Sequence, residues 1–297
     1  SGPLATHRNG PVSSNVRPHR QRRWFTEIRA NMKKCVFCGR SPPEIKMSKE
    51  HVMRSALSKY LPPLVREFTW QQNYRVNGTG EKISKNMQVP QSAFEWTVND
   101  VCKTCNEGWL HDHVETPAEA VVASAMQGAT QVLSLDVARR VALWATKTAV
   151  VRALMDPTPR AVPPEHYEHI RLKLEPPPNT LVWLANTEYC RDPFMRHTRH
   201  GLRLFGEELT TTSHFTSIVY GHMALYVIGA SDHSGLWIYE PTIANIESRD
   251  VLQVWPPHQS PAWPVSSIPL TITKSLTEFV PVPGYANDTD VMLNIHK

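Results

Sequence analysis

The sequence has no apolar run that approaches the length of a membrane-spanning helix. Such a span needs about 18 consecutive apolar residues, and no stretch of the 297 residues supplies them. No apolar segment typical of a secretion signal follows the N-terminus. No internal repeat is visible either. We therefore expect a cytoplasmic protein.

Cysteine is scarce: the chain has five, and four of them form two C-x2-C pairs. The pairs are Cys35 with Cys38 and Cys102 with Cys105. Two such pairs are the usual ligand set of a tetrahedral structural zinc, a site closed to substrate. With four of five thiols committed to metal, the chain fits a reducing compartment better than a disulfide framework. The sequence therefore predicts a zinc site that stabilises the fold and takes no part in chemistry.

A second group of polar residues is interleaved with these pairs. Glu50 and His51 stand between them, and Asn106 directly follows the last cysteine. Phosphodiester hydrolysis needs an aligned nucleophile and positive charge on the phosphate. Magnesium prefers oxygen ligands, usually one or two carboxylates with several waters, so Glu50 and Asn106 suit it. The imidazole pKa of about 6.5 suits His51 as a general base.

This pattern resembles the HNH, or ββα-metal, nucleases, most closely the four-cysteine zinc branch that includes the phage endonuclease VII. In that branch an acidic residue and a histidine follow the first C-x2-C, and C-x2-C-N closes the motif. Residues 35–38, 50–51 and 102–106 match it. The resemblance covers about residues 31–115. The family more often has Asp at the position of Glu50, and its segment between the two halves of the motif is usually shorter.

The resemblance implies a role for each matched residue. His51 would activate water as the general base, and Glu50 and Asn106 would hold a catalytic magnesium or manganese. The four cysteines would bind zinc. DNA is favoured over RNA as the substrate on family grounds, and the products would carry 5′-phosphate and 3′-hydroxyl ends.

Two further residues are candidates for supporting roles. His113 lies seven residues after Asn106 and would share its face of an α-helix, as a third metal ligand or a phosphate contact. Asn99 could brace the loop that carries His51, as the middle Asn of the motif does. A surface or structural role is the alternative for each.

Basic residues are concentrated at the N-terminal end. Residues 1–60 contain thirteen Lys and Arg against three Glu, a net charge of +10, so the remaining residues carry −5 of the total +5. Clustered positive charge favours polyanion binding. We expect a basic flexible arm over residues 1–30 whose arginines contact phosphates; a merely solvated arm is the alternative. These arginines are Arg17, Arg20, Arg22, Arg23 and Arg29.

Several local signals predict individual elements. Asn77-Gly78 predicts a hairpin between residues 68–70 and 82–84. Thr116, with Pro117 and Glu119, predicts a helix start that extends to about residue 127, and Ser134 predicts the cap of the next helix, which ends near Asp156. Short apolar runs predict strands in the second half. These runs are residues 181–185, 217–229, 236–239 and 252–255.

The predicted fold class is α+β: a zinc-stabilised ββα-metal nuclease module at 31–115, a helical segment at 116–156 and an α+β C-terminal domain at 157–297. The last domain shows no second catalytic constellation, because Glu207-Glu208 and its histidine pairs lack partners at diagnostic spacing. It would select substrate, bind a regulatory protein partner or form a homodimer. Cys190, close to an apolar run, predicts a buried free thiol.

The sequence thus favours a magnesium-dependent endonuclease acting on nucleic acid. Two other classes stay open: a zinc-stabilised nucleic-acid-binding protein without cleavage, and a partner-regulated interaction protein.

Overall fold

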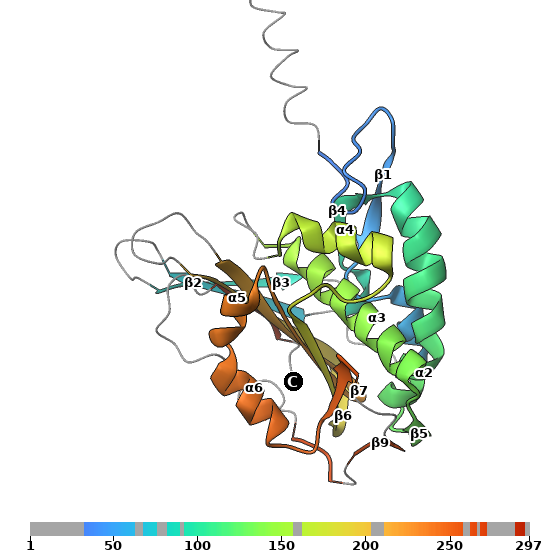
Figure 1. Cartoon of the computed structure of the whole chain (residues 1–297), viewed down its shortest axis with the longest axis vertical. Helices are drawn as coiled ribbons and strands as arrows, with labels where there is room; N and C mark the ends of the chain where they lie inside the picture. Colours follow the sequence, from blue (N-terminus) through green and yellow to red (C-terminus); the bar gives the residue numbers. More distant parts are fainter. Residues whose placement is uncertain are drawn as a thin grey trace, which may run out of the picture. The chain divides into compact units, whose positions relative to one another are not determined.

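A computed structural model gives the arrangement of the chain (Figure 1). Residues 34–297 form one compact unit, and residues 1–33 form the other. The predicted arginine arm belongs to the second of these units and lies outside the described residues. The structure describes residues 33–62, 68–75, 82–89, 92–156, 162–202, 211–257, 262–265, 268–271 and 289–294.

Two antiparallel strands followed by a long helical segment carry both halves of the motif. Strand β1 (Met47–His51) pairs with β4 (Thr97–Cys102), with a bulge after Ser48. A π-helix, η3 (Cys105–Glu115), follows β4 and continues into the α-helix α2 (Thr116–Met126). The order along the chain is therefore strand, strand, helix.

The segment between β1 and β4 is large because it contributes two strands to another sheet. It contains the 3-10 helices η1 (Ser55–Tyr60) and η2 (Ala93–Glu95). Strands β2 (Phe68–Arg75) and β3 (Lys82–Val89) pair in antiparallel register between them. This antiparallel pairing agrees with the predicted hairpin, and its predicted turn at Asn77-Gly78 lies outside the described residues.

The described main sheet has six strands: five in the order β3-β2-β10-β6-β7, and β8, which pairs with residues 182–184 of β6. Its longest strands are β6 (Thr180–Leu202) and β7 (Thr211–Ala230). Strands β8 (Leu252–Trp255) and β10 (Thr289–Asn294) both pair antiparallel with β6. Strand β10 also pairs with β2, so strands from the two ends of the chain share one sheet. A separate short pair joins β5 (Gln131–Val132) and β9 (Ala262–Trp263).

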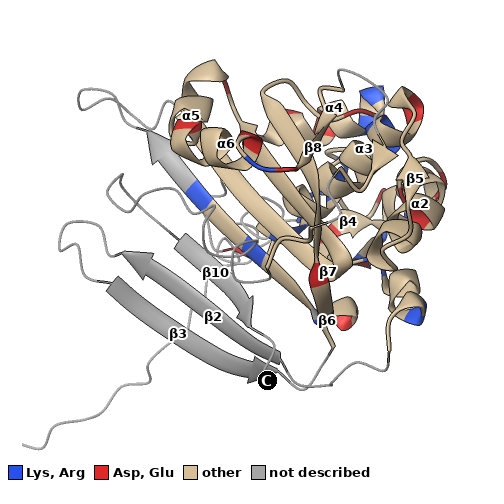
Figure 2. Ribbon diagram, turned by 90° about the horizontal axis from the view of Figure 1, so that it is seen from below, with Lys and Arg blue, Asp and Glu red and all other residues tan. Residues whose placement is uncertain are grey.

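Helices cover both faces of this sheet (Figures 1 and 2). Helices α2, α3 (Leu135–Ala153) and α4 (Pro164–Lys173) lie on one side, and α5 (His233–Trp237) and α6 (Glu240–Glu247) on the other. Successive side chains of a strand point to opposite faces. Val182 accordingly belongs to the core on the α3 side, and Trp183 to the core on the α6 side.

The core on the α3 side extends from Cys35 to Trp263 without interruption. It thus crosses the positions 115 and 156 at which the sequence suggested domain boundaries. Strands and helices are both abundant, and the predicted α+β class is confirmed.

Most local predictions agree with the structure. The Ser134 hydroxyl accepts a hydrogen bond of 3.3 Å from the Val137 amide and caps α3. Cys190 is buried and forms no disulfide within the described residues. Strands are found at three of the four predicted runs in the second half.

Two local predictions are wrong. Residues 236–239 join α5 to α6, because Asp232 caps a helix there by accepting a bond from the Gly235 amide. Thr116 does not cap a helix start, since η3 runs into α2 without a break and Thr116 has helical dihedral angles. Glu119 is instead bound by Arg54 and Lys59.

In the described part of the chain, no helix combines the length and the apolar character that crossing a membrane requires.

Candidate metal centre and adjoining charged pocket

The four cysteines of the two pairs meet in one cluster, as predicted. Their sulfur atoms all lie within 4.8 Å of one another, and Sγ of Cys38 is 3.8 Å from Sγ of Cys102. Tetrahedral zinc with bonds of about 2.3 Å would place its sulfurs about 3.8 Å apart. The cluster is therefore positioned to bind a metal ion, and its geometry is consistent with structural zinc.

The backbone around the first pair favours metal binding. Gly39 has a φ of 70°, which glycine adopts without steric cost, and its amide bonds the Cys35 carbonyl at 2.8 Å. The Cys102 amide donates to Sγ of Cys35 at 3.3 Å. A hydrogen bond from Cys105, together with backbone amides, lowers the pKa of Cys35 to about 4. The lowered pKa favours the Cys35 thiolate, the form that binds metal.

A pocket of about 260 Å³ contains the residues predicted to carry the chemistry. Glu50 and His51 reach it from the end of β1, and Asn106 reaches it from the first turn of η3. The pocket thus brings together all three residues of the predicted catalytic set. Its lining is formed by Glu50, His51, Arg54, Ser55, Ala56, Asn106, His111 and Glu115.

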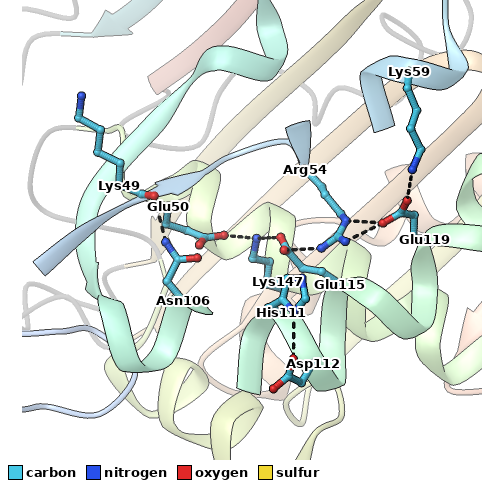
Figure 3. Close-up of polar contacts among 10 residues, drawn as sticks. All are labelled: Lys49, Glu50, Arg54, Lys59, Asn106, His111, Asp112, Glu115, Glu119 and Lys147. Carbon is cyan, nitrogen blue, oxygen red and sulfur yellow. Dashed lines mark hydrogen bonds and ion pairs between the residues drawn. The ribbon is translucent and has the colours of Figure 1, made fainter. Parts of the chain in front are cut away.

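Asn106 holds the strand that carries Glu50 and His51. Its Nδ2 donates to the Lys49 carbonyl at 2.9 Å and to the Ser48 hydroxyl at 3.1 Å (Figure 3). Both bonds use the amide nitrogen, so the amide oxygen is left for a ligand. Asn99, which the sequence suggested for this bracing, is exposed on β4.

His111, and not His113, joins Asn106 at the pocket. A spacing of seven residues returns to the same face in an α-helix, but residues 105–115 form a π-helix, whose hydrogen bonds span five residues. Gly108 interrupts it with φ −102° and ψ −113°. Because this kink lies between Asn106 and the two histidines, the α-helical spacing of seven does not apply: His111 lines the pocket, and His113 is exposed outside it.

A chain of alternating charges includes Glu50, Arg54 and Glu115 of the pocket lining and continues to Lys147 and Glu119, which do not line it (Figure 3). The Lys147 ammonium, from the middle of α3, donates to Oε1 of Glu50 and, at 2.8 Å, to Oε1 of Glu115. Arg54 then bonds Oε2 of Glu115 at 2.7 Å and Oε2 of Glu119 at 2.6 Å. Buried charges are retained when each has an opposite partner, and this chain supplies one for each member.

The surroundings shift the pKa of Glu50, His51 and Glu115. Burial raises the pKa of Glu50, and Lys147 offsets part of that rise. Burial also acts to raise the pKa of Glu115, but Lys147 and Arg54 outweigh it, so this pKa is lowered. Burial, followed by the charge of Lys147, lowers the pKa of His51. The imidazole is therefore neutral near pH 7 and able to accept a proton.

The free donor atoms at the pocket suit a hard divalent cation. Oε2 of Glu50 has no hydrogen bond within the described ranges, and the amide oxygen of Asn106 faces no donor there either. Magnesium prefers such oxygens and retains several waters. His111 bonds Asp112 through Nδ1 at 2.9 Å. Its Nε2 is therefore left to contact a ligand in the pocket.

Three residues that line this pocket or bond its lining escaped the sequence analysis, although each leaves a signal. Lys147 is the one charged residue between Val141 and Val151 in an otherwise apolar or small stretch of the helix. Glu115 lies ten residues after Cys105, beyond the matched motif, and Arg54 lies three residues after His51. Only the tertiary fold shows that the three meet.

Basic side chains are exposed around the cysteine cluster and β1. Residues 33–51 and 102–107 contain six exposed cationic side chains but only two exposed acidic ones, Glu44 and Glu107. By contrast, α6 carries acidic residues alone, and α4 carries both signs (Figure 2). The exposed cations are Lys33, Lys34, Arg40, Lys46, Lys49 and Lys103.

The second half contains a buried polar cluster that the sequence did not indicate. His197 bonds the Thr216 hydroxyl through Nδ1 at 2.7 Å, and its Nε2 lies 3.5 Å from Asp156. Arg152 pairs with Asp156 at 3.1 Å, and the ring of His214 stacks on His197. These side chains are buried between the end of α3 and the sheet, where they contribute to packing.

Comparison of the chain with protein-family models, with curated proteins and with solved structures gives no match.

Proposed function

We propose that this protein is a metal-dependent endonuclease that hydrolyses phosphodiester bonds in nucleic acid, with DNA as the favoured substrate. One observation carries the proposal: Glu50, His51 and Asn106 line a single pocket beside the four-cysteine cluster. The strand, strand, helix order around them is the order that the resemblance to HNH nucleases implies. The cysteines would hold structural zinc away from the reaction.

His51 would act as the general base. It lies half-buried at the pocket wall, and its lowered pKa keeps the imidazole in the form that takes a proton from water. Glu50 and Asn106 would hold magnesium or manganese through their free oxygens. When bound, the cation supplies positive charge that stabilises the phosphate as it becomes more negative.

The exposed cations would bind the nucleic acid backbone. Lys49 precedes Glu50 on β1, and the Lys103 amide bonds the Lys46 carbonyl at 2.8 Å, so these three lysines belong to one region of the surface. His111 at the pocket rim would add a contact to the scissile phosphate. Clustered charge of this kind provides most of the non-specific affinity for nucleic acid.

Plasmid cleavage with a matched variant tests the proposal. Zinc-loaded protein should nick or cut plasmid when magnesium is added and leave it intact when magnesium is omitted, a comparison that does not strip the zinc. His51→Ala should bind DNA with unchanged affinity and cut about 10²- to 10⁴-fold more slowly, because a general base acts in the transition state. Cleavage by His51→Ala at the wild-type rate would remove His51 from the mechanism.

One observation favours a second function, nucleic-acid binding without cleavage. The Glu50 carboxylate already has a cationic partner in Lys147, so the buried charge is balanced without a metal. In that case plasmid would bind in a salt-dependent way and stay intact with magnesium or manganese.

A further inference from the structure

Lys147 is a charged residue in an apolar environment. It lies in the middle of α3 among buried residues, and 1% of its side chain is exposed. Burying an unpaired ammonium is costly, so such a residue persists when it is fully paired. Its partners come from two other elements: Glu50 from β1 and Glu115 from the end of η3.

The hydrogen bonds of this group leave one carboxylate oxygen for a ligand. Lys147 binds Oε1 of Glu50 and Oε1 of Glu115, and Arg54 binds Oε2 of Glu115. Oε2 of Glu50 is then the remaining oxygen of the two carboxylates without a bond in the described part of the chain. Glu50 is 2% exposed, so its carboxylate has little freedom to turn.

We propose that Lys147 is a positioning residue, which fixes Oε1 of Glu50 so that Oε2 alone is presented to a divalent cation in the pocket. The inference rests on the proposed function and extends it, because the residue that orients the metal ligand lies on α3, outside residues 31–115. The segment that resembles HNH nucleases would thus be incomplete without the helix that follows it.

The charges make a prediction that a purely structural role does not. Lys147, Arg54, Glu50 and Glu115 sum to zero, so the ammonium neutralises a carboxylate that would otherwise attract a cation. Replacing Lys147 by a neutral residue should tighten metal binding, because a nearby positive charge is removed. The same change should slow cleavage, because Glu50 is no longer held in place and small misplacements in a site cost about 10²-fold.

The experiment compares full-length, zinc-loaded Lys147→Met with wild type. Electron paramagnetic resonance of free Mn²⁺ gives the Mn²⁺ affinity, which should be higher in Lys147→Met by on the order of 10-fold. The kcat of magnesium-dependent cleavage should be lower by on the order of 10²-fold. Lys173→Met, which removes an exposed lysine of α4, is the control and should match wild type in both. Equal Mn²⁺ affinity in Lys147→Met and wild type would overturn the inference.

A second variant covers the case in which Lys147→Met does not fold. Lys147→Met combined with Glu115→Gln removes one charge of each sign and keeps the net charge of the group. It should bind Mn²⁺ as wild type does and still cut on the order of 10²-fold more slowly; wild-type kcat would overturn the inference. If wild type itself does not cut DNA, the proposed function fails, and the difference in Mn²⁺ affinity still decides the role of Lys147.

Discussion

At the scale of residues, the pocket depends on side chains that hold other side chains. Asn106 fixes the end of β1 through its amide nitrogen, and Lys147 fixes Glu50. The motif predicts Asn106 as a metal ligand, and the structure adds that its Nδ2 bonds the backbone beside Glu50. The proposed metal contact would use the amide oxygen and the observed bonds use the amide nitrogen, so substitutions can separate the two.

Asn106→Asp should destabilise the protein, although the new side chain keeps an oxygen that could bind a metal ion. The substitution replaces the donor Nδ2 by a carboxylate oxygen that faces the Lys49 carbonyl. Losing a typical hydrogen bond costs about 0.5–1.5 kcal/mol. The free energy of unfolding in urea measures the change.

Asn99→Asp is the matched control for that measurement. Asn99 is exposed on β4, and surface substitutions usually change stability by less than about 0.5 kcal/mol. Equal destabilisation of the two variants would contradict the bracing role of Asn106 and restore Asn99 as the candidate.

At the scale of elements, the kink in η3 separates the sequence prediction from the structure. Sequence rules assume an uninterrupted helix of 3.6 residues per turn, and they therefore selected His113, whereas η3 is interrupted at Gly108 and His111 lines the pocket. The four-cysteine cluster connects the same elements. It joins the turn before β1 to the end of β4 and the first turn of η3.

Metal analysis tests the role of the cluster. Purified protein should contain one zinc per chain, and Cys102→Ser should lose it and unfold the region around β1 and β4. Structural zinc contributes about 10 kcal/mol or more in small modules. Cys190→Ser changes the remaining cysteine, which lies outside the cluster, and should keep its zinc. Folded wild-type protein without zinc would contradict the assignment.

At the scale of the whole molecule, the nuclease candidate is embedded in a larger fold. Strands β2 and β3, inserted between β1 and β4, join the sheet of the second half through β10, and α3 supplies Lys147. The positive charge, in contrast to the fold, is concentrated at one end of the sequence. Exposed cations lie near the cysteine cluster, and further basic residues lie in the N-terminal segment. Binding of nucleic acid should follow that distribution.

The salt dependence of DNA binding measures this. Each neutralised phosphate contributes about 0.9 to the slope of log K against log salt. Replacing Lys46, Lys49 and Lys103 by Gln should therefore reduce the slope by about 0.9 for each phosphate that these lysines neutralise in the wild type, and Lys173→Gln should leave it unchanged. Deleting residues 1–23 tests the predicted arginine arm in the same assay. An unchanged slope would show that the arm is solvated and does not touch DNA.

The sequence by itself determined the features that depend on near neighbours. The two C-x2-C pairs specified the metal cluster, Ser134 specified the start of α3, and Asn77-Gly78 specified the β2-β3 hairpin, because spacing and backbone preference act over a few residues. Glu50, His51 and Asn106 were found from the motif in the same way.

Only the tertiary structure decided which distant residues complete the pocket. Glu50 and Lys147 are 97 residues apart, and β10 meets β2 from the opposite end of the chain. No local preference encodes such contacts, because they depend on the tertiary fold. A buried charge requires an ion-pair partner, and the edge of a sheet requires a strand to pair with, from whichever part of the chain lies nearby. The cysteine spacing therefore indicated where the site lies, and the packing of α3 against β1 and η3 determined how its carboxylate is held.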